Sequence, residues 1–225
     1  PEEVTKSWEN IFQFREDKPE INQEGLRKPQ LGALHAISAY FSTQADIEPA
    51  TVVLPTGTGK TEVMLAAMVY LQIPKLLIVV PSNSLRNQIS EKFFGLGILS
   101  RLKVIPNSTF PPSVFIVKSA INTLHEADEM LNRANVIIAT PNALDSSKKK
   151  VVDHLCRGIN TLFIDEAHHI SASTWLKVRD RFNQKKVVQF TATPFRNDGN
   201  TLGGRIIFNY SIGEAQEAKY FRHIN

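Results

Sequence analysis

At residues 54–61 the chain reads Leu54-Pro55-Thr56-Gly57-Thr58-Gly59-Lys60-Thr61. This stretch follows a short apolar run and leads into a pattern typical of a helix. A glycine-rich loop that connects a buried strand to a helix is the usual arrangement of a phosphate-binding loop. Since such loops follow the carboxyl ends of strands in parallel sheets, the stretch predicts an α/β fold. The strict pattern has glycine where this chain has Leu54, so an ordinary glycine-rich turn is the alternative.

Apolar, β-branched runs along the chain indicate the strands of this sheet. They lie at Thr51 to Leu54, Leu76 to Val80, Val114 to Val117, Val136 to Ala139, Thr161 to Ile164 and Val187 to Phe190. Leu31, Leu34, Ile37 and Phe41 mark a helix before the first run, and helical patterns separate several of the others. This alternation predicts a doubly wound, mostly parallel sheet with helices on both faces and ligands at the carboxyl ends of its strands.

The composition is that of a globular domain with a mild positive charge. The 225 residues include 26 basic and 22 acidic side chains, which permits a polyanionic partner without requiring one. Cys156 is the only cysteine, so an internal disulfide and a cysteine-based metal site are excluded. The sequence has no apolar run long enough to cross a membrane and no evident signal peptide, so we expect a cytoplasmic or other reducing setting and no membrane partner. Pro1, in place of an initiating methionine, suggests a processed or excised piece.

The residue types of the loop suit the binding of a nucleoside triphosphate with Mg²⁺. Gly57 and Gly59 allow backbone conformations that direct N–H groups at phosphate oxygens, and the helix that begins near Lys60 adds its positive end. Lys60 is expected to reach the β- and γ-phosphates, and the Thr61 hydroxyl to bind Mg²⁺. The predicted cradle consists of Pro55, Thr56, Gly57, Thr58, Gly59, Lys60 and Thr61.

A second stretch, Asp165-Glu166-Ala167-His168, comes directly after the apolar run that ends at residue 164. Both carboxylates should therefore lie at the exposed end of a strand, near the phosphates. Two adjacent acids allow Asp165 to bind Mg²⁺ while Glu166 polarises the attacking water, so Lys60, Asp165 and Glu166 are the candidate catalytic residues. The alternative is an acidic turn that caps the next helix. His168 is a candidate link to another motif by hydrogen bonding, whereas His169 is predicted to be structural or exposed.

Taken together, these motifs resemble the superfamily 2 helicases and translocases, specifically their first RecA-like domain. The resemblance covers about residues 25 to 212 and implies a P-loop NTPase fold, the RecA-like three-layer sandwich. Within Leu26-Arg27-Lys28-Pro29-Gln30 it marks Gln30 as an adenine contact. An amide can pair with both the amino group and N7 of adenine, so Gln30 favours ATP over GTP, and the implied cofactors are ATP and Mg²⁺. The alternative for Gln30 is a polar residue at the start of a helix.

Two further stretches resemble the family's nucleic-acid backbone contacts. They are residues 81–88, Pro81-Ser82-Asn83-Ser84-Leu85-Arg86-Asn87-Gln88, and residues 140–144, Thr140-Pro141-Asn142-Ala143-Leu144. Phosphate contact needs hydrogen-bond donors at a strand end. The candidate contact residues are Ser82, Asn83, Thr140, Pro141 and Asn142. Ordinary helix capping is the alternative for both stretches. Family members of the RNA type with an Asp-Glu-Ala-Asp box usually carry arginine where Asn83 stands, so DNA is favoured over RNA as the partner.

Thr191-Ala192-Thr193-Pro194-Phe195-Arg196 matches the family motif that couples hydrolysis to nucleic-acid binding. Its hydroxyls follow another predicted strand, so we expect Thr191 and Thr193 to reach His168 across the sheet. The form of this motif, together with the Asp-Glu-Ala-His-His stretch, resembles the DEAH-box-like motor subunits of restriction and phage-defence systems, such as the type III restriction helicase subunits, and related DNA-repair translocases.

We expect three segments. Residues 1–24 form an amphipathic flank, in which Val4, Trp8, Ile11 and Phe12 fall at helical spacing until Lys18-Pro19. Residues 25–212 form the ATP-binding domain, and residues 213–225 a helix that leads to an absent second RecA-like domain. That domain supplies arginines to the ATP site in the family, so turnover without it should be feeble. A nuclease or specificity subunit is a further partner of such motors.

The main alternative to an ATP-driven motor is a nucleotide-gated scaffold that binds nucleic acid or protein without productive turnover. The presence of Glu166 argues against it, because a switch without turnover needs no catalytic base. A small-molecule kinase is less favoured, since it leaves Thr191-Ala192-Thr193 unexplained. Lys148-Lys149-Lys150 either grips a phosphate backbone or, the more favoured alternative, is a solvated loop.

Overall fold

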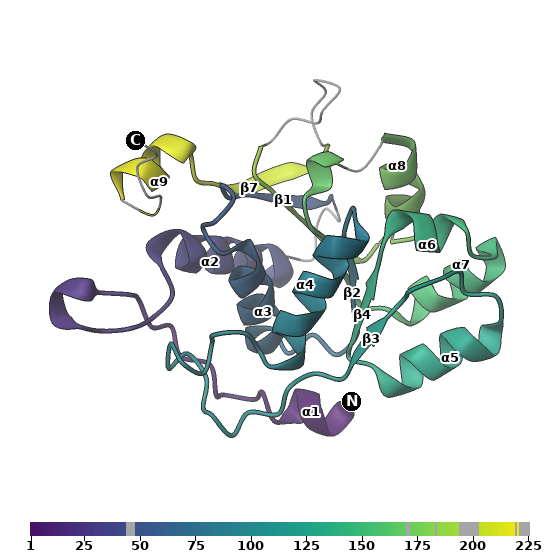
Figure 1. Ribbon diagram of the computed structural model, residues 1–225, viewed down its shortest axis with the longest axis horizontal. Coiled ribbons are helices and arrows are strands. Elements are labelled where there is room, and N and C mark those ends of the chain that lie inside the picture. The colour runs from purple at the N-terminus through teal and green to yellow at the C-terminus, as the bar shows by residue number, and fades with distance from the viewer. Residues whose placement is uncertain (44–47, 170–171, 183, 194–202, 219, 221–225) are drawn as a thin grey trace.

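The computed structural model describes residues 1–43, 48–169, 172–182, 184–193, 203–218 and 220. Within this part, seven strands form one sheet in the order β3-β4-β2-β5-β6-β1-β7 (Figure 1). The strands are β1 (Ala50–Val53), β2 (Leu76–Val79), β3 (Val114–Ile116), β4 (Val136–Ala139), β5 (Thr161–Ile164), β6 (Lys186–Thr191) and β7 (Arg205–Asn209). Every pairing between them is parallel, so the sequence-based prediction of a mostly parallel sheet is confirmed.

Helices cover both faces of the sheet, as in the RecA-like sandwich (Figure 1). They are α1 (Glu2–Lys6), α2 (Lys28–Ser42), α3 (Lys60–Tyr70), α4 (Asn83–Phe94), α5 (Leu124–Arg133), α6 (Pro141–Asp145), α7 (Lys149–Gly158), α8 (Ala172–Asp180) and α9 (Ile212–Glu217), with 3-10 turns η1 (Pro19–Ile21) and η2 (Ala167–His169). None of the described helices is long and apolar enough to span a membrane.

Alternation along the strands separates two hydrophobic cores. Leu76 and Ile78 of β2 point to the face covered by α2, α3 and α4, whereas Leu77 and Val79 point to the face covered by α5, α6, α7 and α8. Successive side chains of a strand point to opposite faces, so a strand buried on both sides is apolar throughout. This burial on both faces explains why the strands were visible in the sequence as continuous apolar runs.

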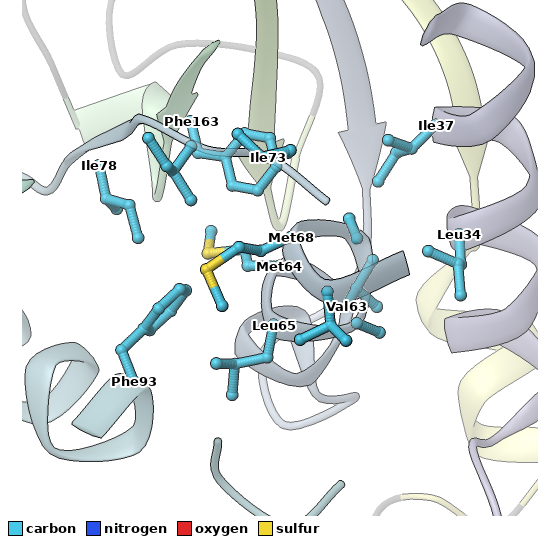
Figure 2. Packing of buried hydrophobic residues seen from close by; sticks show 14 of the residues in the cluster. Leu34, Ile37, Val63, Met64, Leu65, Met68, Ile73, Ile78, Phe93 and Phe163 are labelled. Atoms are coloured by element: carbon cyan, nitrogen blue, oxygen red, sulfur yellow. The ribbon is translucent and has the colours of Figure 1, made fainter. Parts of the chain in front are cut away.

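Helix α3, which follows the phosphate loop, is buried almost all round. Met64 and Met68 pack between the sheet residue Phe163 and Phe93 of α4, while Val63 faces α2 (Figure 2). Full burial of an apolar side chain of this size contributes about 1.5–3 kcal/mol. The helix that begins at the loop is therefore held firmly by α2, α4 and the sheet.

The amino-terminal flank packs on the domain, but its helix is shorter than the spacing predicts. Helix α1 ends at Lys6, and Asn10 adopts a left-handed φ of 55°, a conformation that does not continue a helix. Trp8 is only 1% exposed, and its indole Nε1 donates to the Phe110 carbonyl at 2.9 Å. The flank also pairs with the loop after α4, where the Gln13 amide donates to the Val104 carbonyl at 2.8 Å.

Candidate nucleotide-binding and hydrolysis site

The predicted ATP-site residues meet at the carboxyl edge of three neighbouring strands. β5, β6 and β1 lie side by side and parallel, so the segments that follow them leave the sheet at the same edge. A pocket of about 620 Å³ lies there. Its lining includes Gln30, Thr56, Gly57, Gly59, Lys60, Thr61, Asp165 and Glu166.

Two glycines give the phosphate loop its shape. Gly57 and Gly59 have φ angles of 85° and 94°, in the left-handed region that glycine adopts without strain. A Cβ atom on Gly59 would lie 2.0 Å from Nε2 of Gln30, so a side chain at this position would displace the Gln30 amide. Both donors of Thr58 turn inward to the Pro55 carbonyl, its amide at 3.2 Å and its hydroxyl at 2.6 Å. Thr58 thus shapes the loop in this structure.

Leu54, the departure from the strict loop pattern, is accommodated by its place in the core. Its side chain is fully buried among the residues under α3, and its amide donates to the Thr191 carbonyl at 2.9 Å. The Leu54 carbonyl lies 3.4 Å from Nζ of Lys60. Only the backbone of residue 54 faces the loop, which explains why a large side chain is tolerated there.

Gln30 joins helix α2 to the phosphate loop. Its Nε2 donates to the carbonyls of Thr58 at 3.2 Å and Gly59 at 3.4 Å, and its Oε1 accepts the Arg27 amide at 2.8 Å. The side chain is 4% exposed, although it lies in the pocket lining. The amide that the sequence assigns to adenine therefore also fixes the loop, and its contact with adenine stays a prediction.

Lys60 and Glu166 form an ion pair across the pocket. Nζ of Lys60 lies 2.9 Å from Oε1 of Glu166, and both side chains are mostly buried. Glu166 has a φ of 48°, a costly backbone conformation for a residue other than glycine. Such strain often marks functional positions, and here it accompanies a carboxylate that faces the phosphate loop.

Asp165 is more deeply buried than its neighbour, at 5% exposure. Burial, and next the negative charge of Glu166, raise the pKa of the Asp165 carboxyl from 3.8 to about 6. Its Oδ1 is buried and has no hydrogen-bond partner in the described part of the chain. An unpaired buried carboxylate oxygen is costly unless a cation binds it, so the residue fits the ligand set of Mg²⁺ with Thr61. The described residues contain no cluster of three His, Cys, Asp or Glu side chains suited to a metal.

A chain of close polar contacts leads from this site to the end of β6. Nδ1 of His168 lies 3.4 Å from Oε2 of Glu166 and 2.8 Å from Oγ1 of Thr191. The Thr191 hydroxyl donates to the Thr193 carbonyl at 2.6 Å and accepts the Thr193 amide at 3.2 Å. Because the one hydroxyl proton is used on Thr193, Nδ1 of His168 is assigned as the donor to Thr191. The side chain of His169 and residues 194–196 lie outside the described residues.

The predicted nucleic-acid residues gather in a separate pocket of about 450 Å³ at the same edge of the sheet. Ser82 and Thr140 cap helices α4 and α6, accepting the amides of Leu85 and Ala143 at 3.3 Å each. Asn83 and Asn142 are exposed in the lining. Pro141, in contrast, is buried in the first turn of α6 and does not line the pocket. Capping and a ligand-facing position thus coexist at Ser82 and Thr140.

Sequence reasoning missed several residues that line the two pockets. Lys118 and Ser119 line the second pocket, directly after the predicted strand that ends at Val117, so the same strand-end rule would have found them. Arg27 lines the nucleotide pocket and donates to the Gly57 carbonyl at 3.3 Å. Lys92 and Arg101 line its far side, and no local pattern marks them, because α4 and the loop after it meet α3 only in the folded chain.

With this geometry in view, a comparison with family models identifies the class of protein. Residues 23–196 match the family described as "Type III restriction enzyme, res subunit", and this match covers well over half of the chain. The chain therefore belongs to this family. A search of curated proteins finds no match.

Solved structures share the fold at low sequence identity. The type ISP restriction-modification enzyme LlaGI, a nuclease-deletion mutant in complex with a DNA substrate mimic, is 16% identical at a TM-score of 0.53, over 89% of this chain and 21% of that chain. The UvsW helicase from bacteriophage T4 is 14% identical at a TM-score of 0.56, over 92% of this chain and 67% of that chain. The type ISP enzyme LlaBIII bound to DNA is 17% identical at a TM-score of 0.51, over 88% of this chain and 16% of that chain. This chain thus spans about a fifth or less of the two restriction enzymes.

Proposed function

We propose that this domain binds and hydrolyses ATP as part of a superfamily 2 translocase that moves on or remodels nucleic acid in restriction, defence or repair. The observation that carries the proposal is the chain of contacts from Lys60 through Glu166 and His168 to Thr191. These residues come from three neighbouring strand ends, and their contacts link the phosphate loop to the motif after β6. A glycine-rich turn without function would not need this chain.

In the proposed site, Lys60 and the loop amides hold the β- and γ-phosphates of ATP, while Thr61 and Asp165 hold Mg²⁺. When bound, the metal neutralises charge that develops on the phosphates. Lys60 must leave Glu166 to reach a phosphate, which frees the carboxylate at the moment the substrate is bound. Glu166 then orients the attacking water and accepts its proton.

His168 is proposed to report the state of Glu166 to the end of β6. When Glu166 exchanges Lys60 for a water molecule, the 3.4 Å contact between its Oε2 and Nδ1 of His168 would change. Thr191 and Thr193 lie next in the chain of contacts, so they are the first residues to feel that change. This provides a route by which hydrolysis and nucleic-acid binding affect one another.

DNA is the proposed polymer. Two of the structurally similar restriction enzymes are described in complex with DNA or a DNA substrate mimic, which supports this choice. The backbone would lie in the pocket with Ser82, Asn83, Thr140 and Asn142, where amide and hydroxyl groups can donate to phosphate oxygens. A second RecA-like domain would complete the ATP site with arginines, and a nuclease or specificity subunit would be a further partner.

The test is ATP turnover of this chain with duplex DNA, single-stranded DNA or RNA at low salt, where backbone binding is strongest. We expect slow turnover that DNA stimulates most, and a loss of about a hundredfold or more in Glu166→Gln with Mg-ATP binding retained. Equal turnover in Glu166→Gln and the wild type would refute the role of the base and favour the nucleotide-gated scaffold. Bound Mg-ATP without any turnover would fit both the scaffold and a motor that needs the second domain, and turnover of a chain that includes that domain would then decide between them.

A further inference from the structure

The run Lys148-Lys149-Lys150 does not form a solvated loop, because Lys149 and Lys150 make up the first turn of α7. A groove of about 740 Å³ is lined by residues of α7, by residues of α8 and the position after it, and by Leu124 at the start of α5. Its lining contains five cationic and two acidic side chains: Lys149, Lys150, Arg157, Lys177, Arg181, Asp153 and Asp180. Neither the phosphate loop nor the pocket at Ser82 and Thr140 includes any of them.

Most of the positive charge in the groove is unpaired. Asp153 pairs with Arg181 at 2.9 Å, and Asp180 lies 3.5 Å from Arg179, which is not in the lining. The remaining cations, Lys149, Lys150, Arg157 and Lys177, form no ion pair within the described residues. The groove therefore presents an excess of positive charge that the protein itself does not neutralise.

The spread of these charges indicates a polyanion and not a single phosphate group. Eight residues separate Lys149 from Arg157, which is about 12 Å along a helix. Lys177 adds a charge from the neighbouring helix. No side-chain hydrogen bond caps the amino-terminal end of α7, so the positive end of the helix dipole adds to the charges of Lys149 and Lys150 in its first turn. A ligand with several phosphates in a row can contact all of these groups together.

The lining also distinguishes nucleic acid from an acidic protein. Leu124 is the one apolar residue of the lining, whereas the centres of protein interfaces are enriched in aromatic residues and depleted of lysine. Lysine is a common phosphate ligand that acts as a point charge. The groove therefore fits a sugar-phosphate backbone better than a peptide.

The position of the groove connects it to the proposed nucleic-acid pocket. Ser146 lines that pocket and Lys149 lines the groove. Lys149 is three positions after Ser146, so their Cα atoms lie within about 11 Å of each other. We propose that a nucleic-acid strand held at the Ser82 and Thr140 pocket continues along α7, where the cations of this groove bind its phosphates. This extension rests on the proposed function.

The test compares Lys149→Gln/Lys150→Gln with a control of equal charge, Lys6→Gln/Lys103→Gln, whose residues are exposed and line neither site. We measure anisotropy of labelled single-stranded DNA at several salt concentrations. The groove variant should bind a long strand about tenfold more weakly at low salt, with a salt slope smaller by about 1.4, while the control matches the wild type. Both variants should bind a strand of about four nucleotides as tightly as the wild type does. This length is the shortest site expected for one module.

A variant that removes a negative charge, and not a positive one, controls for a nonspecific loss of DNA binding. Asp180→Asn removes an exposed acid from the groove and should tighten binding of the long strand. Unchanged affinity and slope in the lysine variant, in a chain that still binds DNA, would overturn the groove and leave the proposed function intact. Absence of DNA binding in the wild type would instead contradict the proposed function. The same loss of affinity for polyglutamate as for DNA in Lys149→Gln/Lys150→Gln would identify an acidic-protein surface. That result would also overturn the inference.

Discussion

At the scale of single residues, the central feature is a buried carboxyl group with one oxygen that lacks a hydrogen bond. Asp165 lies beside Glu166, and its Oδ1 has no hydrogen bond within the described residues. Burial and the neighbouring charge raise its pKa from 3.8 to about 6, so folding shifts the preference toward the neutral acid relative to the unfolded chain. A bound cation would reverse this preference. The unpaired oxygen of Asp165 thus lowers the stability of the free domain, whereas in a complex with a cation it would serve as a ligand.

We expect this pKa shift to appear as a pH dependence of stability. Because the folded pKa is raised, the neutral acid stabilises the fold below about pH 4, and this contribution is lost as the pH rises through about 6. Without Mg²⁺, the unfolding free energy of the wild type should fall by about 3 kcal/mol between these limits relative to Asp165→Asn. Urea unfolding at several pH values measures this, with exposed Asp145→Asn as the control. Parallel pH profiles of the wild type and Asp165→Asn would contradict the assignment.

At the scale of secondary-structure elements, lysines at the amino ends of strands hold the ends of helices. Nζ of Lys185 donates to the carbonyls of Cys156, Arg157 and Ile159 at 2.7, 2.8 and 2.5 Å, at the end of α7. Lys186 does the same for the end of α2, and Lys75 for the end of α5. These ammonium groups satisfy carbonyls that the helices leave unpaired and complement the negative helix ends.

We expect Lys185→Met to destabilise the chain by about 1–2 kcal/mol, because it removes charged hydrogen bonds but leaves the partly exposed stem. Chemical denaturation measures the change, and Lys103→Met, at an exposed position outside these contacts, serves as the control. An equal effect of the two substitutions would show that the carbonyl contacts of Lys185 contribute nothing. This contact could not be predicted from the sequence, because the partners lie 26 to 29 residues away along the chain.

At the scale of the whole molecule, the amino-terminal flank is part of the core. Trp8 is among the largest fully buried side chains, and it belongs to the hydrophobic core that also contains residues of α2, α3 and α4. We expect Trp8→Ala to cost about 3–5 kcal/mol of unfolding free energy. Ile21→Ala, at a residue that is 64% exposed, should be nearly neutral. Thermal unfolding of both variants tests this, and a Trp8→Ala melting temperature equal to that of the wild type would contradict it.

The parts of the fold that the sequence predicted are those set by local pattern. Parallel strands buried on both faces are continuous apolar runs in the sequence. Because ligands bind at the carboxyl ends of such strands, the sequence also predicted that Lys60, Asp165 and Thr191 lie close together. Features that depend on distant segments were not predictable. The hydrogen bond from Trp8 to the Phe110 carbonyl is one, and the groove lined by Lys149 and Lys177 is another. The left-handed backbone of Glu166 and the contacts of Gln30 with the loop also arise only in the folded chain.

The most direct test of the account is a calorimetric titration of Mg-ATP into the wild type and Lys60→Ala. Lys60 is 8% exposed and faces the phosphate loop and Glu166, so no other side chain of the loop can replace its charge. We expect the wild type to bind Mg-ATP, and Lys60→Ala to remain folded with binding abolished. Unchanged affinity in Lys60→Ala would contradict the assignment of this loop as the nucleotide site and, with it, the proposed function.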